Sequence, residues 1–191
     1  MILTRGTVER LEPSEPSEPV ESRAVSVSEH KAAGPARVRV FVLTVSDTRT
    51  ADTDTAGRAI RELLETAGHV VAGTAIEPDE PARVAELVRQ QAVIADVDAI
   101  ITTGGTGLTS RDSTFEAIDA LLTKRLPGFG ELFRMLSYQD IGPAAKVGRA
   151  CAGTIGRVVV ISLPGSEKAV RLAMDKLVVP ELAHLVQQAT K

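Results

Sequence analysis

Hydrophobic positions along most of the chain alternate between continuous apolar runs and runs with helical spacing. Three runs have the pattern of strands, 37–46, 70–76 and 97–103, and the first and third are typical of buried strands. Between them, residues 55–69 and 81–95 place apolar side chains three and four positions apart, which is typical of amphipathic helices. This β-α-β-α-β order with short connections predicts a parallel sheet with right-handed crossovers.

The second half of the chain continues with helices and a hairpin. Residues 113–126 and 127–142 have helical patterns, and a Pro-Gly pair stands between them. Two apolar runs flank Thr154–Gly156, which predicts an antiparallel hairpin. A helical segment follows to the C-terminus, and Pro180 either breaks or restarts it. The predicted fold class is α/β, with a mostly parallel sheet and an antiparallel edge near the C-terminus.

Residues 1–35 differ in composition from the rest of the chain. They include the repeat EPSEPSEPVES, which is rich in proline and glutamate and poor in apolar groups. Proline removes backbone donors and glutamates repel one another, so too little apolar burial is available to offset the entropy of ordering. We expect a disordered N-terminal extension at 1–35, or a docking tail for a partner, followed by one domain at 36–191.

Composition narrows the class of protein further. Only 3% of residues are aromatic and Trp is absent, so the core must consist of Val, Ile, Leu and Ala, which suits a sheet covered by helices. The net charge of -3 argues against nucleic acid or an anionic membrane as the main partner. No apolar run reaches the length of a membrane span, and the N-terminus lacks the pattern of a secretory signal. The single cysteine, Cys151, fits a reducing cytoplasm and a buried apolar position.

Four loops follow the predicted strands, and the carboxyl ends of the strands are where open α/β sheets bind ligands. The loops are TVSDTR (44–49), EPDE (77–80), TTGGTGLTSRD (102–112) and LPGS (163–166). The convergence of four loops on one edge of the sheet predicts a binding site more strongly than any single motif does.

The third loop is rich in glycine and threonine. Gly104, Gly105 and Gly107 can take positive φ and direct backbone N–H groups into one concavity, and Thr103 and Thr106 add hydroxyl donors. This arrangement favours a phosphate, although a tight strand-to-helix turn would need the same glycines for steric reasons. The loop has neither the Gly-Lys-Ser/Thr of a Walker motif nor the spacing of a dinucleotide fingerprint.

The last loop contains Pro164, Gly165 and Ser166 between an apolar strand and a helix. Ser166 can cap the helix, and the free N–H groups and dipole of a helix start favour an anion. A plain capped helix explains the same residues without any ligand.

Acidic residues stand at or just past three strand ends: Asp47, Asp79 and Asp112. Carboxylates beside a phosphate site are electrostatically unfavourable unless a cation lies between them. Mg²⁺ binds through one or two carboxylates together with substrate phosphates, which is the combination that nucleotidyl transfer needs. Asp79 and Asp112 could instead cap the helices that follow them, and Arg111 could pair with Asp112 or contact a phosphate.

The motifs TVSDTR, PDE, IITTGGTGLTSRD, PGFGELFRMLS and LPGS, in this order, resemble the Mog/MoaB family of molybdenum-cofactor biosynthesis proteins. The G domain of gephyrin is of the same type. The resemblance covers about Val38 to the C-terminus. It implies a three-layer α/β/α fold, assembly as a homotrimer or hexamer, and partnership with other molybdenum-cofactor enzymes.

The resemblance also implies an activity. Mog-type members bind molybdopterin and adenylate its terminal phosphate with Mg-ATP, which releases pyrophosphate. By position, Asp79 and Asp112 match the two aspartates that are important for the reaction and would hold Mg²⁺. The resemblance implies that Gly104–Gly107 and Pro164–Ser166 contact phosphate and nucleotide, and that Ser46 and Asp47 border the site.

Three functions remain open from the sequence. The SRD motif favours the adenylyltransferase, whereas the length and the 128–166 region look MoaB-like, which leaves a molybdopterin-binding scaffold without catalysis as the alternative. The third function is that of a related domain that serves another nucleotide, as in competence-damage-type proteins. The second domain of those proteins has no counterpart in this sequence, which counts against this function. In the segment 127–142, four apolar residues have helical spacing: Phe129, Leu132, Phe133 and Leu136. This spacing predicts that they pack in the core or at a subunit contact.

Overall fold

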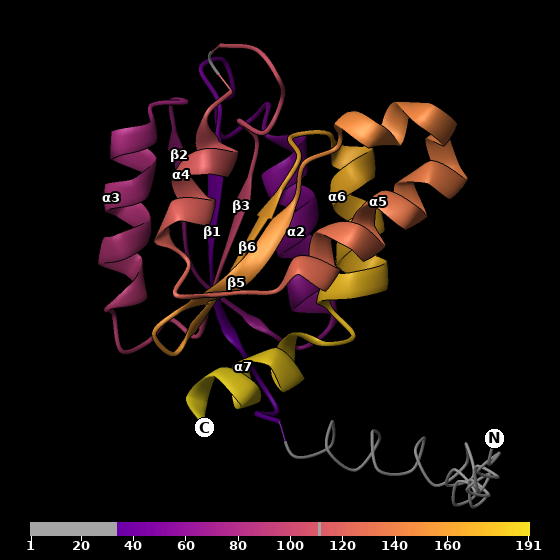
Figure 1. The fold of residues 1–191 in the computed structure, drawn as a ribbon. Coiled ribbons are helices and arrows are strands. Elements are labelled where there is room, and N and C mark those ends of the chain that lie inside the picture. The colour runs from indigo at the N-terminus through magenta and orange to yellow at the C-terminus, as the bar shows by residue number, and fades with distance from the viewer. Residues whose placement is uncertain (1–33, 111) are drawn as a thin grey trace, which may run out of the picture.

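The computed structural model describes residues 34–110 and 112–191 (Figure 1). The N-terminal extension predicted at 1–35 lies outside the described residues except for its last two positions. Arg111, predicted at the candidate site, also lies outside them.

One mixed sheet of six strands forms the centre of the fold, in the order β2-β1-β3-β6-β5-β4. The strands are β1 (Arg39–Val45), β2 (Val70–Glu77), β3 (Ala99–Thr103), β4 (Lys124–Arg125), β5 (Cys151–Ile155) and β6 (Val158–Leu163). The first four in the order pair in parallel, whereas β5 is antiparallel to both β6 and β4. The predicted parallel sheet with an antiparallel edge near the C-terminus is confirmed.

Helices cover both faces of this sheet and give the three layers that the resemblance implies (Figure 1). The helices are α2 (Thr55–Thr66), α3 (Pro81–Ala92), α4 (Thr114–Leu121), α5 (Pro127–Ile141), α6 (Glu167–Ala173) and α7 (Leu182–Thr190), with a 3-10 helix η1 (Gly142–Val147) and a π-helix η2 (Met174–Val178). Side chains of α3 and α4 pack on one face of the sheet. Side chains of α2, α5, α6 and α7 pack on the other.

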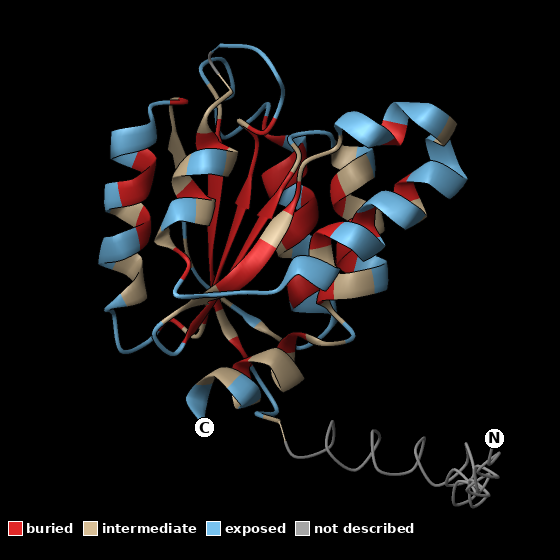
Figure 2. Ribbon diagram, viewed as in Figure 1, coloured by how far each residue is buried: buried red, intermediate tan, exposed pale blue. Residues whose placement is uncertain are grey.

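The alternation of side chains along the strands divides the core into two clusters. Val40 and Val42 of β1 face α2 and α6, whereas Phe41 and Leu43 face α3 and α4. All four are buried, and Figure 2 shows the central strands mostly in the colour of buried residues. Full burial of each such side chain contributes about 1.5–3 kcal/mol, so a strand of this kind is specified by burial on both faces.

Two boundaries differ from the sequence prediction. The helix predicted at 113–126 ends at Leu121, because the following residues form β4, in which Lys124 pairs with Thr154. This strand of two residues exists only through its pairing with β5, and no local pattern reveals it. Pro180 lies between η2 and α7, so the helical segment stops before this proline and a new helix begins after it.

The order of the strands places a switch point beside β1. The chain passes from β1 to β2 on one side, and then to β3 on the other side of β1. The loops that leave β1 and β3 therefore run in opposite directions and open a crevice at the carboxyl ends of these strands, where open sheets of this type bind ligands. In Figure 1 these loops lie at the top of the molecule.

Candidate functional site

A cavity of about 440 Å³ lies at the switch point, among the loops that leave β1, β2, β3 and β6. It is lined by Val45, Ser46, Asp47, Asp79, Gly104, Gly105, Thr106, Gly107, Asp112, Val147, Gly148, Arg149, Pro164 and Gly165. All four loops predicted to converge contribute to its wall. Ten of the residues predicted for the site are among those that line it.

Two described residues of the prediction, Thr103 and Ser166, do not line this cavity. Thr103 lies in an adjoining recess of about 60 Å³, and its hydroxyl donates to the carbonyl of Pro164 at 2.8 Å, which ties the third loop to the fourth. Ser166 is the N-cap residue of α6, but its side chain makes no capping hydrogen bond. Arg111 lies outside the described residues, so its predicted role stays a prediction.

The first two glycines of the third loop are required by close approach. Gly104 has φ +103°, and a Cβ there would lie 2.1 Å from the carbonyl oxygen of Val45. Gly105 has φ +61°, and a Cβ there would lie 2.2 Å from Oγ1 of Thr114. The N–H of Gly104 donates to the carbonyl of Leu163 at 3.1 Å. Gly104 therefore shapes the cavity, whereas its own N–H group is already used by the backbone.

Asp79 is buried where the second and third loops meet. Its carboxylate accepts hydrogen bonds from Oγ1 of Thr114 at 3.0 Å and from Oγ of Ser113 at 3.4 Å, both at the start of α4. Its backbone N–H donates to Oδ1 of Asp47 at 3.1 Å. The N-cap residue of α3 is Glu80, so the carboxylate of Asp79 is directed to the cavity side and does not cap its own helix.

Asp112 closes the third loop upon itself. Its Oδ2 accepts hydrogen bonds from the backbone N–H of Thr109 at 3.0 Å and from the hydroxyl of Thr109 at 2.5 Å. The bond from the Thr109 hydroxyl lowers the pKa of the Asp112 carboxyl most, and desolvation opposes it. The backbone N–H of Thr109, the backbone of Gly107 and the charge of Arg149 add to the lowering. The carboxylate is therefore ionised at neutral pH. The N-cap residue of α4 is Ser113, so Asp112 does not cap that helix.

Arg149 also lines the cavity, and no motif or spacing in the sequence predicts it there. It precedes β5 and belongs to none of the four loops. Its guanidinium donates to the carbonyls of Thr106 and Gly107 and forms an ion pair with Glu116 of α4. Only the antiparallel edge of the sheet brings this residue beside a loop about forty positions earlier in the chain.

The charge of the wall bears on any metal. Three carboxylates (Asp47, Asp79 and Asp112) and one guanidinium line the described part of the cavity, so phosphates are repelled unless a cation accompanies them. Among the described residues, no group of three or more His, Cys, Asp or Glu is arranged to hold a metal. One or two carboxylates are the ligands that Mg²⁺ uses when it is bound together with substrate phosphates, so the described donor set fits that kind of site.

Comparison with known proteins identifies the class. The family model described as "Probable molybdopterin binding domain" matches residues 41–184. The molybdenum cofactor biosynthesis protein B of Bacillus anthracis is 53% identical over 167 residues, which cover 84% of this chain and 96% of the relative. The corresponding protein of Bacillus subtilis is 50% identical over 168 residues, covering 87% and 99%.

Solved structures agree with this class. A crystal structure of molybdenum cofactor biosynthesis protein B superposes with a TM-score of 0.79 at 50% identity, covering 81% of this chain and 96% of that one. The fold is thus that of an α/β domain of the molybdopterin-binding class. The chain belongs to the Mog/MoaB family of molybdenum-cofactor biosynthesis proteins. None of the described helices is long and apolar enough to cross a membrane.

Proposed function

We propose that this protein binds molybdopterin in the cavity between the four loops and adenylates its terminal phosphate with Mg-ATP in the cytoplasm. The observation that supports this most directly is the meeting of Asp79 and Asp112 on one cavity wall with Gly105–Gly107 and Gly165. The two carboxylates suit a cation shared with phosphates. The glycine positions let the backbone approach an anionic ligand closely. The binding domain is residues 36–191.

The reaction requires no covalent intermediate with the protein. An oxygen of the terminal phosphate of molybdopterin attacks the α-phosphorus of ATP, the bond from that phosphorus to the β-phosphate oxygen breaks, and pyrophosphate leaves. Mg²⁺ that arrives with ATP offsets the charge that develops on the phosphates. Asp79 and Asp112 would hold this Mg²⁺ in place, and backbone N–H groups of the third loop would orient the phosphates.

A second candidate function is a scaffold that holds molybdopterin without adenylating it. Asp112 favours this reading, because both bonds from Thr109 are made to one oxygen of its carboxylate and give it a structural use within the loop. The two functions share the cavity and differ in whether Asp112 acts on a substrate.

Mixing the purified protein with molybdopterin, ATP and MgCl₂ separates the two. The adenylyltransferase releases pyrophosphate in proportion to adenylyl-molybdopterin, and excess EDTA abolishes the release. Retention of molybdopterin through gel filtration without any pyrophosphate supports the scaffold. Absence of both pyrophosphate release and molybdopterin retention rejects both functions.

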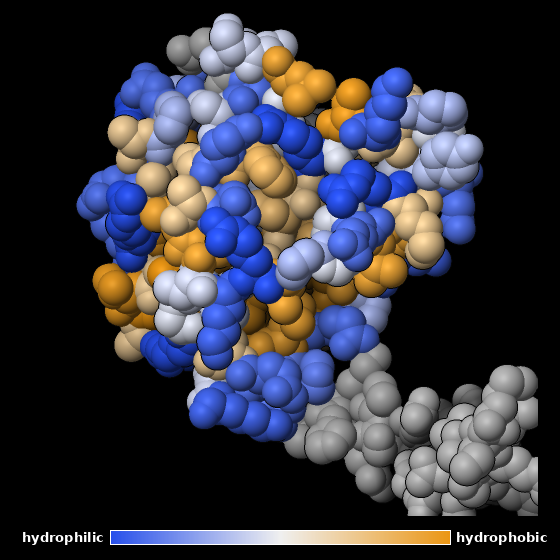
Figure 3. Space-filling view, viewed as in Figure 1, coloured by the Kyte–Doolittle hydropathy of each residue, from blue (hydrophilic) through white to orange (hydrophobic). Residues whose placement is uncertain are grey.

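We also propose that the protein assembles as a homotrimer or hexamer through α5. Four apolar side chains of this helix are exposed at helical spacing: Leu132, Met135, Tyr138 and Ile141. Its opposite face is buried through Phe133. Figure 3 shows apolar surface among charged groups on the right of the molecule, where α5 lies in Figure 1. A helix that is apolar on two faces is expected to bury the second against another chain.

A further inference from the structure

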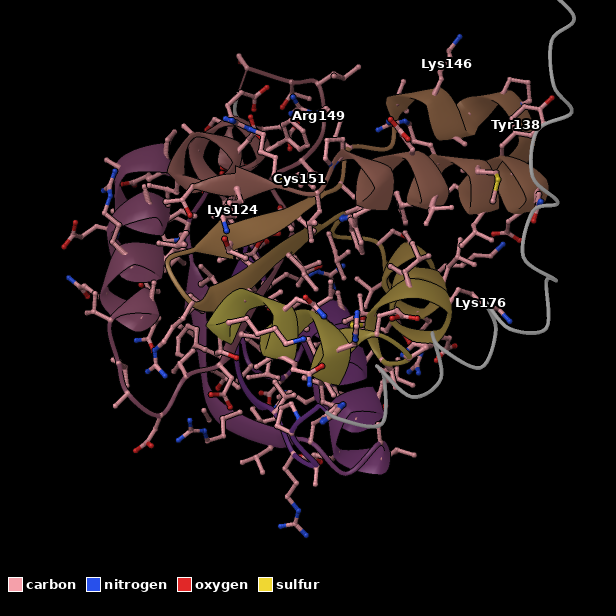
Figure 4. The ribbon with its side chains drawn as sticks, turned by 60° about the horizontal axis from the view of Figure 1, so that its bottom comes forward. Lys124, Tyr138, Lys146, Arg149, Cys151 and Lys176 are labelled. Carbon is pink, nitrogen blue, oxygen red and sulfur yellow. The ribbon has the colours of Figure 1, made fainter. Side chains whose placement is uncertain are left out.

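Arg149 lies in the segment between η1 and β5, beside the loop that connects β3 to α4 (Figure 4). The side chain is 20% exposed, and the guanidinium carbon lies 4.9 Å from the centre of the Phe115 ring. Stacking on Phe115 holds one face of the guanidinium and leaves its edges to donate hydrogen bonds.

The edges of the guanidinium reach both limbs of this loop: the ascending limb, which follows β3, and the descending limb, which leads into α4. On the ascending limb, Nε donates to the carbonyl of Thr106 at 2.8 Å, and Nη2 donates to the carbonyl of Gly107. On the descending limb, Nη2 also donates to the carbonyl of Asp112 at 3.3 Å. The remaining terminal nitrogen, Nη1, donates to the carboxylate of Glu116 in the first turn of α4.

The tip of the loop, residues 108–110, depends on such hydrogen bonds for its position. Leu108 at its tip is 70% exposed, and Thr109 and Ser110 are exposed as well, so apolar packing holds little of it in place. Inside the segment, Asp112 bonds to Thr109, which makes the tip a small closed unit. The contacts of Arg149 connect the base of that unit to β5 and α4.

A guanidinium suits this task because it presents five donors in one plane, and three carbonyls and a carboxylate accept from it here. The ammonium of a lysine is a single point with three donors and cannot span both limbs and the helix. All three nitrogens of Arg149 are engaged by the protein, which favours a role in placing the loop over direct contact with a phosphate.

We propose that Arg149 is a positioning residue that clamps both limbs of the 105–113 loop and thereby sets where the Asp112 carboxylate and the loop amides stand in the cavity. The link to turnover rests on the proposed function, whereas the clamp itself does not.

Hydrogen exchange tests the clamp without any substrate. In Arg149→Ala, amides of the peptide covering 105–113 should exchange on the order of tenfold faster than in the wild type. Arg149→Lys keeps the charge but not the fork, and it should lose most of the protection as well. Arg157→Ala is the matched control, because Arg157 is an exposed arginine with a carbonyl bond to Ala95, remote from the cavity. It should leave the loop unchanged.

Turnover gives the second arm. Pyrophosphate release by Arg149→Ala should fall about 10–100-fold, mainly in kcat, as for other residues that orient a functional group. Low millimolar guanidinium should restore part of it, because the ion can refill the space on Phe115, and should not stimulate the wild type. Should Arg149→Ala fail to fold, Arg149→Lys supplies both readouts.

Several results would overturn the proposal. Unchanged exchange of the 105–113 peptide in both Arg149 variants removes the clamp. Unchanged exchange together with a tenfold weaker binding of ATP makes Arg149 a direct substrate contact. Faster exchange with turnover like that of the wild type rejects its effect on Asp112. If the wild type itself releases no pyrophosphate, the proposed function fails, and the exchange arm still decides whether the clamp exists.

Discussion

Replacement of Gly105 by alanine tests how the cavity is built. The new Cβ would stand 2.2 Å from Oγ1 and 2.7 Å from Cβ of Thr114, and 2.5 Å from Oδ2 of Asp79. Both neighbours are buried, and they are hydrogen bonded to each other. The methyl group must therefore push apart the pair that fixes the Asp79 carboxylate. We expect Gly105→Ala to weaken both the fold and the site.

The magnitude has two parts that a control can separate. The positive φ costs an alanine about 1–2 kcal/mol. Overpacking adds about 1–3 kcal/mol, and loss of a hydrogen bond to a charged group adds about 1.5–3 kcal/mol. Gly156 has φ +56° and no atom within 4 Å of a built Cβ, so Gly156→Ala isolates the first part. The excess of Gly105→Ala over this control should be about 3 kcal/mol or more.

Urea unfolding at one fixed protein concentration, followed by circular dichroism, measures this excess. An excess of this size lowers the urea midpoint of Gly105→Ala by roughly 1–2 M relative to that of Gly156→Ala. Pyrophosphate release by the folded fraction should also fall for Gly105→Ala and stay unchanged for Gly156→Ala. Equal midpoints for the two variants would refute the packing of Thr114 and Asp79 against Gly105, because only the backbone cost would remain.

Three further predictions concern single side chains. Asp112→Asn keeps an acceptor for Thr109 but removes the charge, so pyrophosphate release should fall roughly 100-fold or more while the melting temperature stays within a few degrees; wild-type turnover would remove Asp112 from the reaction. Burial raises the pKa of the Cys151 thiol to about 12 from 9.0. The native thiol should therefore resist a disulfide reagent at pH 8, and the fold should lose stability as the pH rises above about 9, where the unfolded thiol ionises; rapid labelling of the native protein would contradict this. Met135→Asp should convert the assembly to monomers in light scattering without unfolding it, whereas a monomeric wild type would remove the proposed interface on α5.

Much of the fold follows from local pattern. The apolar run at β1 and the helical spacing in α2 report burial directly, because each element buries a face with its own period. Gly68 follows the C-cap residue of α2 and has φ +82°. Its place after the last apolar position of the helix predicts this conformation. β4 was missed, because two exposed residues form a strand only when β5 lies beside them.

The candidate site divides in the same way. Asp79 and Asp112 were found because they follow strands, and parallel strands bring their carboxyl ends to one edge. Two contacts that hold the site together are not predicted by the sequence. Thr114 bonds to Asp79 across 35 positions, and Arg149 bonds to Thr106 across 43. Such contacts depend on side-chain direction and on packing between layers, which a linear pattern does not record.

The sequence by itself determined the α/β class, the four loops at one edge and the family resemblance, because burial periodicity and motif order are local properties. Only the tertiary structure decided that Gly104 uses its N–H for the sheet, that Asp112 folds the loop onto Thr109, and that Arg149 joins its two limbs. The contacts of Gly104 and Arg149 join segments that meet only after the sheet has formed, and their geometry is set by the packing of that sheet.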